Sequence, residues 1–425
     1  MTIAIFLGSL LAAMAIGMPI SYSLLVSGAA LMWHLDMFDA QILAQNLIEG
    51  SNSFPLLAVP FFMLAGEIMN AGGLSKRIVL FAMSLVGHIK GGLGYVAIMA
   101  AVLMAALSGS AVADAAALAA LLLPMMAHAG HDRAQSAGLL SAAAIIAPII
   151  PPSIGFVIFG VAANVSISKL FMAGIAPGVM LGVALCITWW YVSGKEGVQP
   201  PAKATTAERV HAFKQALFAL GLPVIVIVGL KMGVFTPTEA AVVAAMYALV
   251  VSMFVYRELK WGQLYGLFLA AAKTTAVIMF LVAAAMVSAW LITVAQLPDQ
   301  LVSLLEPLLD SPKLLMAAIM VLVMVVGTAM DMTPTVLILT PVLMPIVKAA
   351  GIDPVYFGVL FIMNNAIGLI TPPVGTVLNT VAGVGKVSMD EVTKGVWPFM
   401  AAQFVLMFLM VLFPQLVMVP ARWFY

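Results

Sequence analysis

The sequence predicts an all-α integral membrane protein built as an inverted repeat, with five spans and one re-entrant hairpin in each half. The first observation behind this prediction is composition: 64% of the 425 residues are apolar and 8% are charged, whereas a soluble domain carries about 25% charged residues. The second is a Pro-Pro pair that occurs twice, at Pro151-Pro152 and at Pro372-Pro373, 221 residues apart. The third is the distribution of charge between the loops, which orients the halves.

The membrane spans are expected where apolar runs approach the length of about 20 residues that crosses a bilayer. Tandem prolines inside such a run break the helix and free backbone carbonyls. Because the two Pro-Pro pairs fall within 137–164 and 355–384, we expect these two spans to be broken helices. The predicted spans are, in order, 3–18, 20–34, 55–71, 137–164, 171–192, 215–234, 238–256, 274–293, 355–384 and 396–418.

Two further apolar stretches, 93–127 and 314–349, carry polar residues at their centres and are predicted to be re-entrant hairpins. Ser108–Ser110 lies in the middle of the first stretch and Asp331 in the middle of the second, at the same offset of 221 residues. Each leg has about 15–18 residues, near the lower limit for a span. Polar residues at such a tip are tolerated only where they meet protein, ions or water.

Charged segments outside the spans give the orientation of the halves. Amphipathic arms at 73–90 and 298–310 precede the hairpins and are expected to lie in the membrane interface. The basic linker 195–214 is expected to be cytoplasmic by the positive-inside rule. An odd number of spans on each side of this linker makes the first repeat, 1–194, and the second, 215–425, opposite in topology.

Four carboxylates lie within the apolar stretches, and each would cost about 2.5–3.5 kcal/mol at a helix centre. Asp331, at the second hairpin tip, is the strongest candidate to bind an ion or substrate, with capping of the next leg as the alternative. Asp114 could bind or could neutralise the start of its own helix. Glu67 could contact a partner helix, and Glu239 has the position of a first-turn acid.

Small hydroxyl and amide side chains gather at the hairpin tips and proline breaks. Together with free backbone carbonyls they can ligate a hard monovalent cation, and the N-termini of broken helices suit a substrate carboxylate. One serine alone would more simply serve helix packing, but four such clusters at symmetric positions predict a binding site. These residues are Ser108, Ser110, Ser153, Thr333, Thr371, Thr376 and Asn379.

Several other functions find little support in the sequence. There is no phosphate-binding Gly-Lys-Ser/Thr motif and no nucleophile elbow, and a net charge of +1 gives no argument for nucleic acid. An intramembrane aspartyl hydrolase remains an alternative if Asp114 and Asp331 form an acid pair. A proton pump or channel would need a chain of buried ionisable residues that the spans lack. The chain is therefore expected to be no enzyme.

Several motifs of this chain resemble those of the large membrane subunit of tripartite ATP-independent periplasmic (TRAP) transporters. They are Phe54–Phe62, Ser108–Asp114, Ile145–Ser153, Lys169–Gly178 and Thr371–Gly375. The similarity runs essentially end to end. Within the family, the sequence most resembles permeases of the 2,3-diketo-gulonate type. The resemblance implies a multi-pass protein of the bacterial inner membrane. It also implies two partners: a small membrane subunit of about four helices and a periplasmic substrate-binding protein.

The same resemblance implies a mechanism: a sodium gradient drives import of a small organic or sugar acid, without an organic cofactor. An outer scaffold would hold a mobile, elevator-type transport domain that contains both hairpins. A stand-alone sodium-coupled carrier is the alternative. One sodium site would use Ser108, Ser110, Pro151 and Pro152, and the other Asp331, Thr333, Thr371 and Gly375. The substrate would contact Ser110, Ser153, Thr333, Thr376 and Asn379.

Overall fold

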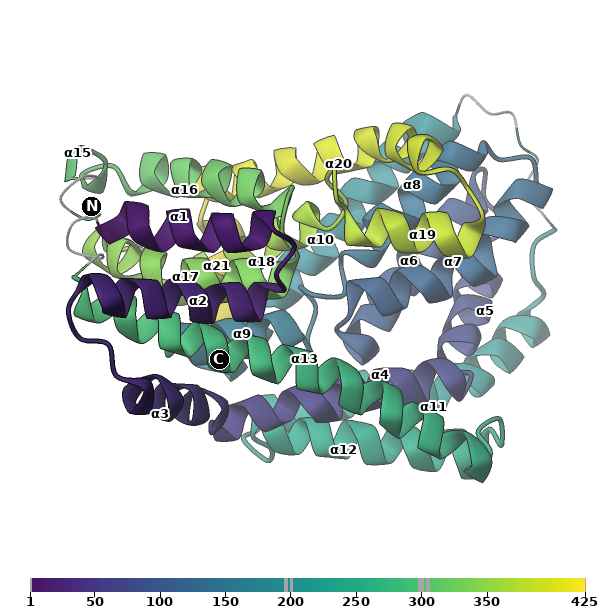
Figure 1. Ribbon diagram of the computed structural model, residues 1–425. Coiled ribbons are helices and arrows are strands. Elements are labelled where there is room, and N and C mark those ends of the chain that lie inside the picture. The colour runs from purple at the N-terminus through teal and green to yellow at the C-terminus, as the bar shows by residue number, and fades with distance from the viewer. Residues whose placement is uncertain (1, 195–197, 199–201, 297–301, 303–305, 425) are drawn as a thin grey trace.

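The computed structural model describes residues 2–194, 198, 202–296, 302 and 306–424, and all the regular structure in these ranges is helical (Figure 1). Eight of the described helices are long and apolar enough to cross a membrane. The predicted all-α membrane fold is therefore confirmed. The expected second arm, 298–310, falls largely outside the described residues, which include only the short helix α15 (Glu306–Leu309) and its neighbours.

The first half contains a helix that the apolar pattern did not indicate. Helix α3 is polar on one side, and its N-terminus is capped by Asp39, whose carboxylate accepts from the amides of Gln41 and Ile42. Short amphipathic helices of this kind give no continuous apolar run. The elements are α1 (Thr2–Ala15), α2 (Ile20–His34), α3 (Ala40–Ser51), η1 (Phe54–Leu57), α4 (Ala58–Ala71), α5 (Leu74–Val86), α6 (Gly92–Ser108), α7 (Ala111–His128), α8 (Arg133–Ala144), α9 (Ile154–Ala163) and α10 (Ile167–Ser193).

The second half has longer helices than its apolar runs indicated. Helix α11 begins at Thr206, inside the expected linker, because Thr205 and Glu208 form a capping box. Helix α13 begins at Trp261 and continues through Lys273, whereas the predicted span begins only at residue 274. The elements are α11 (Thr206–Lys231), α12 (Pro237–Val250), η2 (Val251–Val255), α13 (Trp261–Val294), α16 (Pro312–Gly327), α17 (Met332–Ala349), α18 (Pro354–Gly368), α19 (Thr376–Gly385), α20 (Met389–Leu412) and α21 (Gln415–Arg422).

Both Pro-Pro pairs lie in breaks between two helices. The first break, 145–153, separates α8 from α9, and the second, 369–375, separates α18 from α19. Helix α9 packs against α17, which is a leg of the second hairpin, while α19 packs against α7, which is a leg of the first. The two halves therefore interlock, and each break is held next to a hairpin of the other half.

The helices form two bodies that meet along α4 and α13. Figure 1 shows α3, α4, α11, α12 and α13 as a layer along the lower side, with the hairpins, the broken helices and α20 above it. Helix α4 packs on α12 and α13, and α13 also contacts α17 of the upper body. Helix α4 also contacts α6, a leg of the first hairpin, so both hairpins lie close to the lower layer.

A close crossing of α8 and α20 fixes the approach to the first break. A Cβ atom built on Gly138 would lie 2.2 Å from the carbonyl carbon of Gly395, so only glycine allows this approach. The Gln403 side-chain amide donates to the Ala142 carbonyl at 2.8 Å, near the end of α8. This crossing holds the last turn of α8, and with it the start of the break.

Candidate functional site

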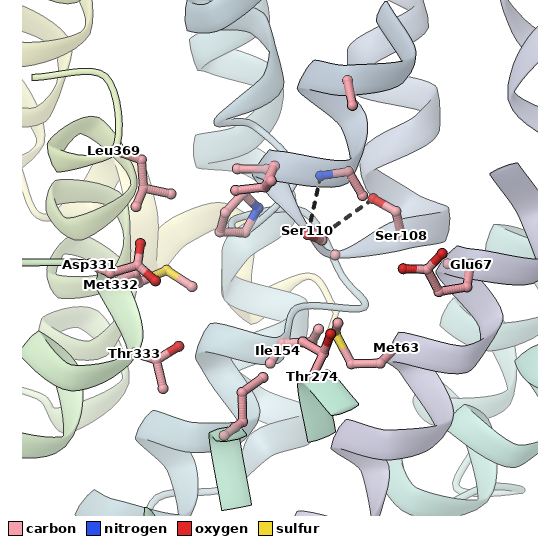
Figure 2. A pocket seen from close by; sticks show the side chains of 18 residues that line it. Met63, Glu67, Ser108, Ser110, Ile154, Thr274, Asp331, Met332, Thr333 and Leu369 are labelled. Atoms are coloured by element: carbon pink, nitrogen blue, oxygen red, sulfur yellow. Dashed lines mark hydrogen bonds between the residues drawn. The ribbon is translucent and has the colours of Figure 1, made fainter. Parts of the chain in front are cut away.

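Both hairpin tips and both helix breaks border one cavity of about 410 Å³, whose remaining wall is formed by α4 and α13 (Figure 2). The lining includes Met63, Gly66 and Glu67 of α4, Ser108, Gly109 and Ser110 at the first tip, Pro148 and Ile154 at the first break, Thr274 and Ile278 of α13, Asp331, Met332 and Thr333 at the second tip, and Leu369 at the second break. Residues far apart in the chain therefore meet at the point where the repeats interlock.

The first tip is a turn between α6 and α7 that presents two serine hydroxyls. Ser110 is the N-cap of α7, and its hydroxyl accepts from the Ala113 amide at 3.4 Å. The Ser108 hydroxyl accepts from the Ser110 amide at 3.2 Å and donates to Asp114 Oδ1 at 2.6 Å. Asp114 is 1% exposed, and its Oδ2 has no partner in the described part of the chain. A buried carboxylate thus lies directly behind the hydroxyls.

The second tip presents a carboxylate where the first presents a serine. Asp331 is the N-cap residue of α17, but its side chain makes no capping hydrogen bond. Instead, Thr376 Oγ1, at the start of α19, donates to Asp331 Oδ1 at 3.3 Å. Thr333 also lines the cavity. The carboxylate therefore joins the second tip to the second break and leaves oxygen atoms free for a ligand.

Three predicted site residues use their polar groups inside the breaks and do not line the cavity. Ser153 is fully buried; its hydroxyl donates to the Pro148 carbonyl and accepts from the Phe156 amide. The Thr371 hydroxyl donates to the Ile367 carbonyl at 2.8 Å. The Asn379 side-chain amide, which is exposed, donates to the Val374 carbonyl at 2.7 Å. Their observed hydrogen bonds shape the two breaks.

The three remaining predicted residues, Pro151, Pro152 and Gly375, contribute backbone. A Cβ atom on Gly109 would lie 2.4 Å from the Pro152 carbonyl oxygen, so the first tip lies directly against the first break. Gly375 has a positive φ of 46° and is the N-cap of α19. The Pro152 carbonyl is thus held at the first tip, although the prolines and Gly375 do not themselves line the cavity.

Sequence reasoning missed most of the wall that α4 and α13 supply. Met63, Gly66, Thr274 and Ile278 line the cavity, but they belong to ordinary apolar runs in the sequence. A Cβ atom on Gly66 would lie 3.7 Å from the Ser108 carbonyl oxygen, which places α4 against the first tip. The one available signal was Glu67, a carboxylate within an apolar run and next to this glycine.

The charges around the cavity are of one sign. Glu67 and Asp331 line it from opposite sides (Figure 2), and Asp114 lies behind Ser108. None of the 18 lining residues, all in the described part of the chain, is lysine, arginine or histidine. Such a cavity favours cations and repels a lone anion. The hydrogen bonds of Asp114 and Asp331 go to hydroxyl groups, so the two do not form the acid pair of an aspartyl hydrolase.

We predict that Ser108→Ala destabilises the protein by about 1–3 kcal/mol, because the buried Asp114 carboxylate loses its hydroxyl donor. The thermal unfolding midpoint in detergent should fall clearly below that of Ser84→Ala. Ser84 is a matched control, since its hydroxyl bonds only to a carbonyl of its own helix, that of Phe81. Equal midpoints for the two variants would contradict a structural role for the Ser108–Asp114 pair.

Comparison with known proteins gives a consistent result. The family model for the DctM component of the tripartite ATP-independent periplasmic transporter matches residues 7–416. The 2,3-diketo-L-gulonate TRAP transporter large permease YiaN of Escherichia coli (strain K12) is 58% identical over the full length of both chains. The sialic acid TRAP transporter large permease SiaM of Vibrio cholerae is 39% identical, over 94% of this chain and 93% of its own.

One solved structure shares the fold at low sequence identity. The crystal structure of the Alcanivorax borkumensis YdaH transporter superposes with a TM-score of 0.65, at 16% identity, over 88% of this chain and 89% of that one. At this identity the likeness concerns the arrangement of helices alone.

Proposed function

The chain belongs to the DctM family and is the large permease of a TRAP transporter, and from this premise we propose that it imports a small organic or sugar acid together with sodium ions. It is a multi-pass protein of the bacterial inner membrane and not an enzyme. The observation that carries the proposal is the single cavity at which two hairpin tips and two helix breaks meet, lined by hydroxyl and carboxylate oxygens and by no basic residue.

Sodium is the cation that this arrangement suits. A hard monovalent ion prefers oxygen ligands, and unwound backbone supplies carbonyls without adding charge. One site would form from Ser108 and Ser110 with the backbone at Pro151 and Pro152, which the first tip touches. The other would form at Asp331 and Thr333 with backbone near 371–375, which Thr376 joins to Asp331.

The substrate is proposed to lie between the two tips. The relatives named above are permeases for 2,3-diketo-L-gulonate and sialic acid, which are both acids. Because no basic side chain lines the cavity, bound sodium ions would balance the carboxylate. Ser110, Thr333 and Thr376 supply hydroxyls near the tips, while Ser153 and Asn379 would hold the breaks in shape.

Movement of one body against the other would alternate access to this cavity. The hairpins and broken helices form one side of it, and α4 and α13 form the other. We propose that the first group moves as an elevator against a scaffold that includes α4 and α11–α13. A small membrane subunit of about four helices and a periplasmic binding protein would complete the transporter.

The test is uptake of labelled sugar acids into proteoliposomes that contain this chain and its small partner. We expect uptake to require both an inward sodium gradient and the cognate binding protein. Uptake that needs sodium but not the binding protein would indicate a stand-alone carrier. Uptake that is independent of sodium at constant pH would overturn the proposed coupling.

A further inference from the structure

Glu67 is a carboxylate of the central cavity to which the two sodium sites assign no role. It is half-buried in the C-terminal half of α4 and lines the cavity. Within the described part of the chain it has no hydrogen bond or ion pair; its neighbour Asn70 accepts instead from Ser75. An unpaired carboxylate within a membrane span is costly, so its presence at this place indicates a function.

The position of Glu67 near the first hairpin tip indicates what this function is. Gly66 faces Ser108 at van der Waals distance, which places α4 against the first tip, and Glu67, the next residue of α4, lines the same cavity as Ser108 and Ser110. Figure 2 shows the Glu67 side chain on the side of Ser108 and Ser110, across the cavity from Asp331. Glu67 belongs to α4, which packs on α12 and α13, whereas Ser108 belongs to the first hairpin.

The effect of the Glu67 charge on a substrate anion depends on whether cations are bound in the cavity. A carboxylate beside an empty tip repels a substrate anion, and it attracts a cation bound at that tip. No basic residue among those lining the cavity offsets its charge. A substrate carboxylate therefore meets strong repulsion in the sodium-free cavity, and bound cations reduce this repulsion.

We propose that Glu67 is the residue that makes movement of the anionic substrate conditional on bound sodium. It acts from the wall formed by α4, as a positioning and coupling residue, and it need not touch the ion. The inference rests on the proposed function, because it assumes sodium-coupled import of an acid. It goes further by assigning the coupling to one carboxylate outside both hairpins.

The test replaces Glu67 by glutamine, which keeps the size and removes the charge. In proteoliposomes, Glu67→Gln should raise the sodium concentration for half-maximal uptake about tenfold, within the usual range of coupling between two sites. It should also allow exchange of substrate across the membrane without sodium, which the unchanged protein is expected to exclude. Glu67→Asp should keep the sodium requirement.

Glu49→Gln is the matched control, because Glu49 is an exposed carboxylate on α3 outside this cavity. If Glu67→Gln fails to assemble, Thr274→Glu tests the same idea by adding a carboxylate to the same wall; it should lower the half-maximal sodium concentration. An unchanged sodium dependence in the variant that assembles, without sodium-free exchange, overturns the role of Glu67. If the unchanged protein itself needs no sodium, the proposed function fails instead.

Discussion

Replacing Asp331 by asparagine is expected to abolish sodium-driven uptake while leaving the protein folded. Asparagine keeps the shape of the side chain and an oxygen that can accept from Thr376, so the link between the second tip and the second break survives. The negative charge is lost, and an interaction with a charged group contributes up to about 3 kcal/mol, or about a hundredfold in affinity. Uptake at a fixed sodium gradient measures the effect.

Asp310→Asn is the control for this variant, because Asp310 is exposed and lies outside the cavity. It should transport like the unchanged protein. Thermal unfolding of both variants in detergent should show the same midpoint. Normal sodium-driven uptake by Asp331→Asn would remove this residue from the ion site and leave it only the structural role of joining the second tip to the second break through Thr376.

Much of the fold could be predicted because a membrane imposes strong constraints on sequence. Apolar runs of sufficient length identify spans, and a proline pair inside a run identifies a break. Where the observed helices differ from the predicted spans, the cause is local helix capping. Asp39 begins α3 in a stretch without an apolar run, and the capping box of Thr205 and Glu208 begins α11 within the expected linker. Glu239 also forms a capping box, with Thr236, as its first-turn position indicated.

The two hairpin tips of the site could be predicted, because they occupy corresponding positions in the two repeats. Ser110 and Asp331 are 221 residues apart in the sequence, and each is the N-cap residue of the second leg of its hairpin. Symmetry therefore identified both tips. It could not identify α4 and α13 as the facing wall, because Gly66 and Thr274 become site residues only through packing between bodies.

The repeat also could not show which polar groups are already in use. The sequence predicts Ser153 and Thr371 as site residues together with the tip residues, but their hydroxyls bond to backbone carbonyls within the breaks. A freed carbonyl in a broken helix must find a donor. These side chains satisfy that need, which explains why hydroxyl residues occur at the breaks without facing the cavity.

Replacing Gly109 by alanine is also expected to cause a large loss of uptake, because Gly109 lies at the contact between the first tip and the first break. Gly109 has a φ of 60°, in the left-handed region that costs other residues about 1–2 kcal/mol. In addition, a Cβ atom there would lie 2.4 Å from the carbonyl oxygen of Pro152. Backbone cannot yield as a flexible side chain does, so the tip must separate from the break. We expect uptake to fall more than about tenfold.

Gly351→Ala is the control that separates the Cβ clash with the Pro152 carbonyl from the cost of a left-handed φ. Gly351 also has a left-handed φ, of 67°, but a Cβ atom there would meet nothing within 4 Å. This variant should lose about 1–2 kcal/mol of stability and keep its uptake. If Gly109→Ala transports as well as Gly351→Ala, close contact between the tip and the Pro152 carbonyl is not needed for transport. Loss of uptake in Gly109→Ala alone would mean that the ion ligands of the tip and the break act only when they are held together.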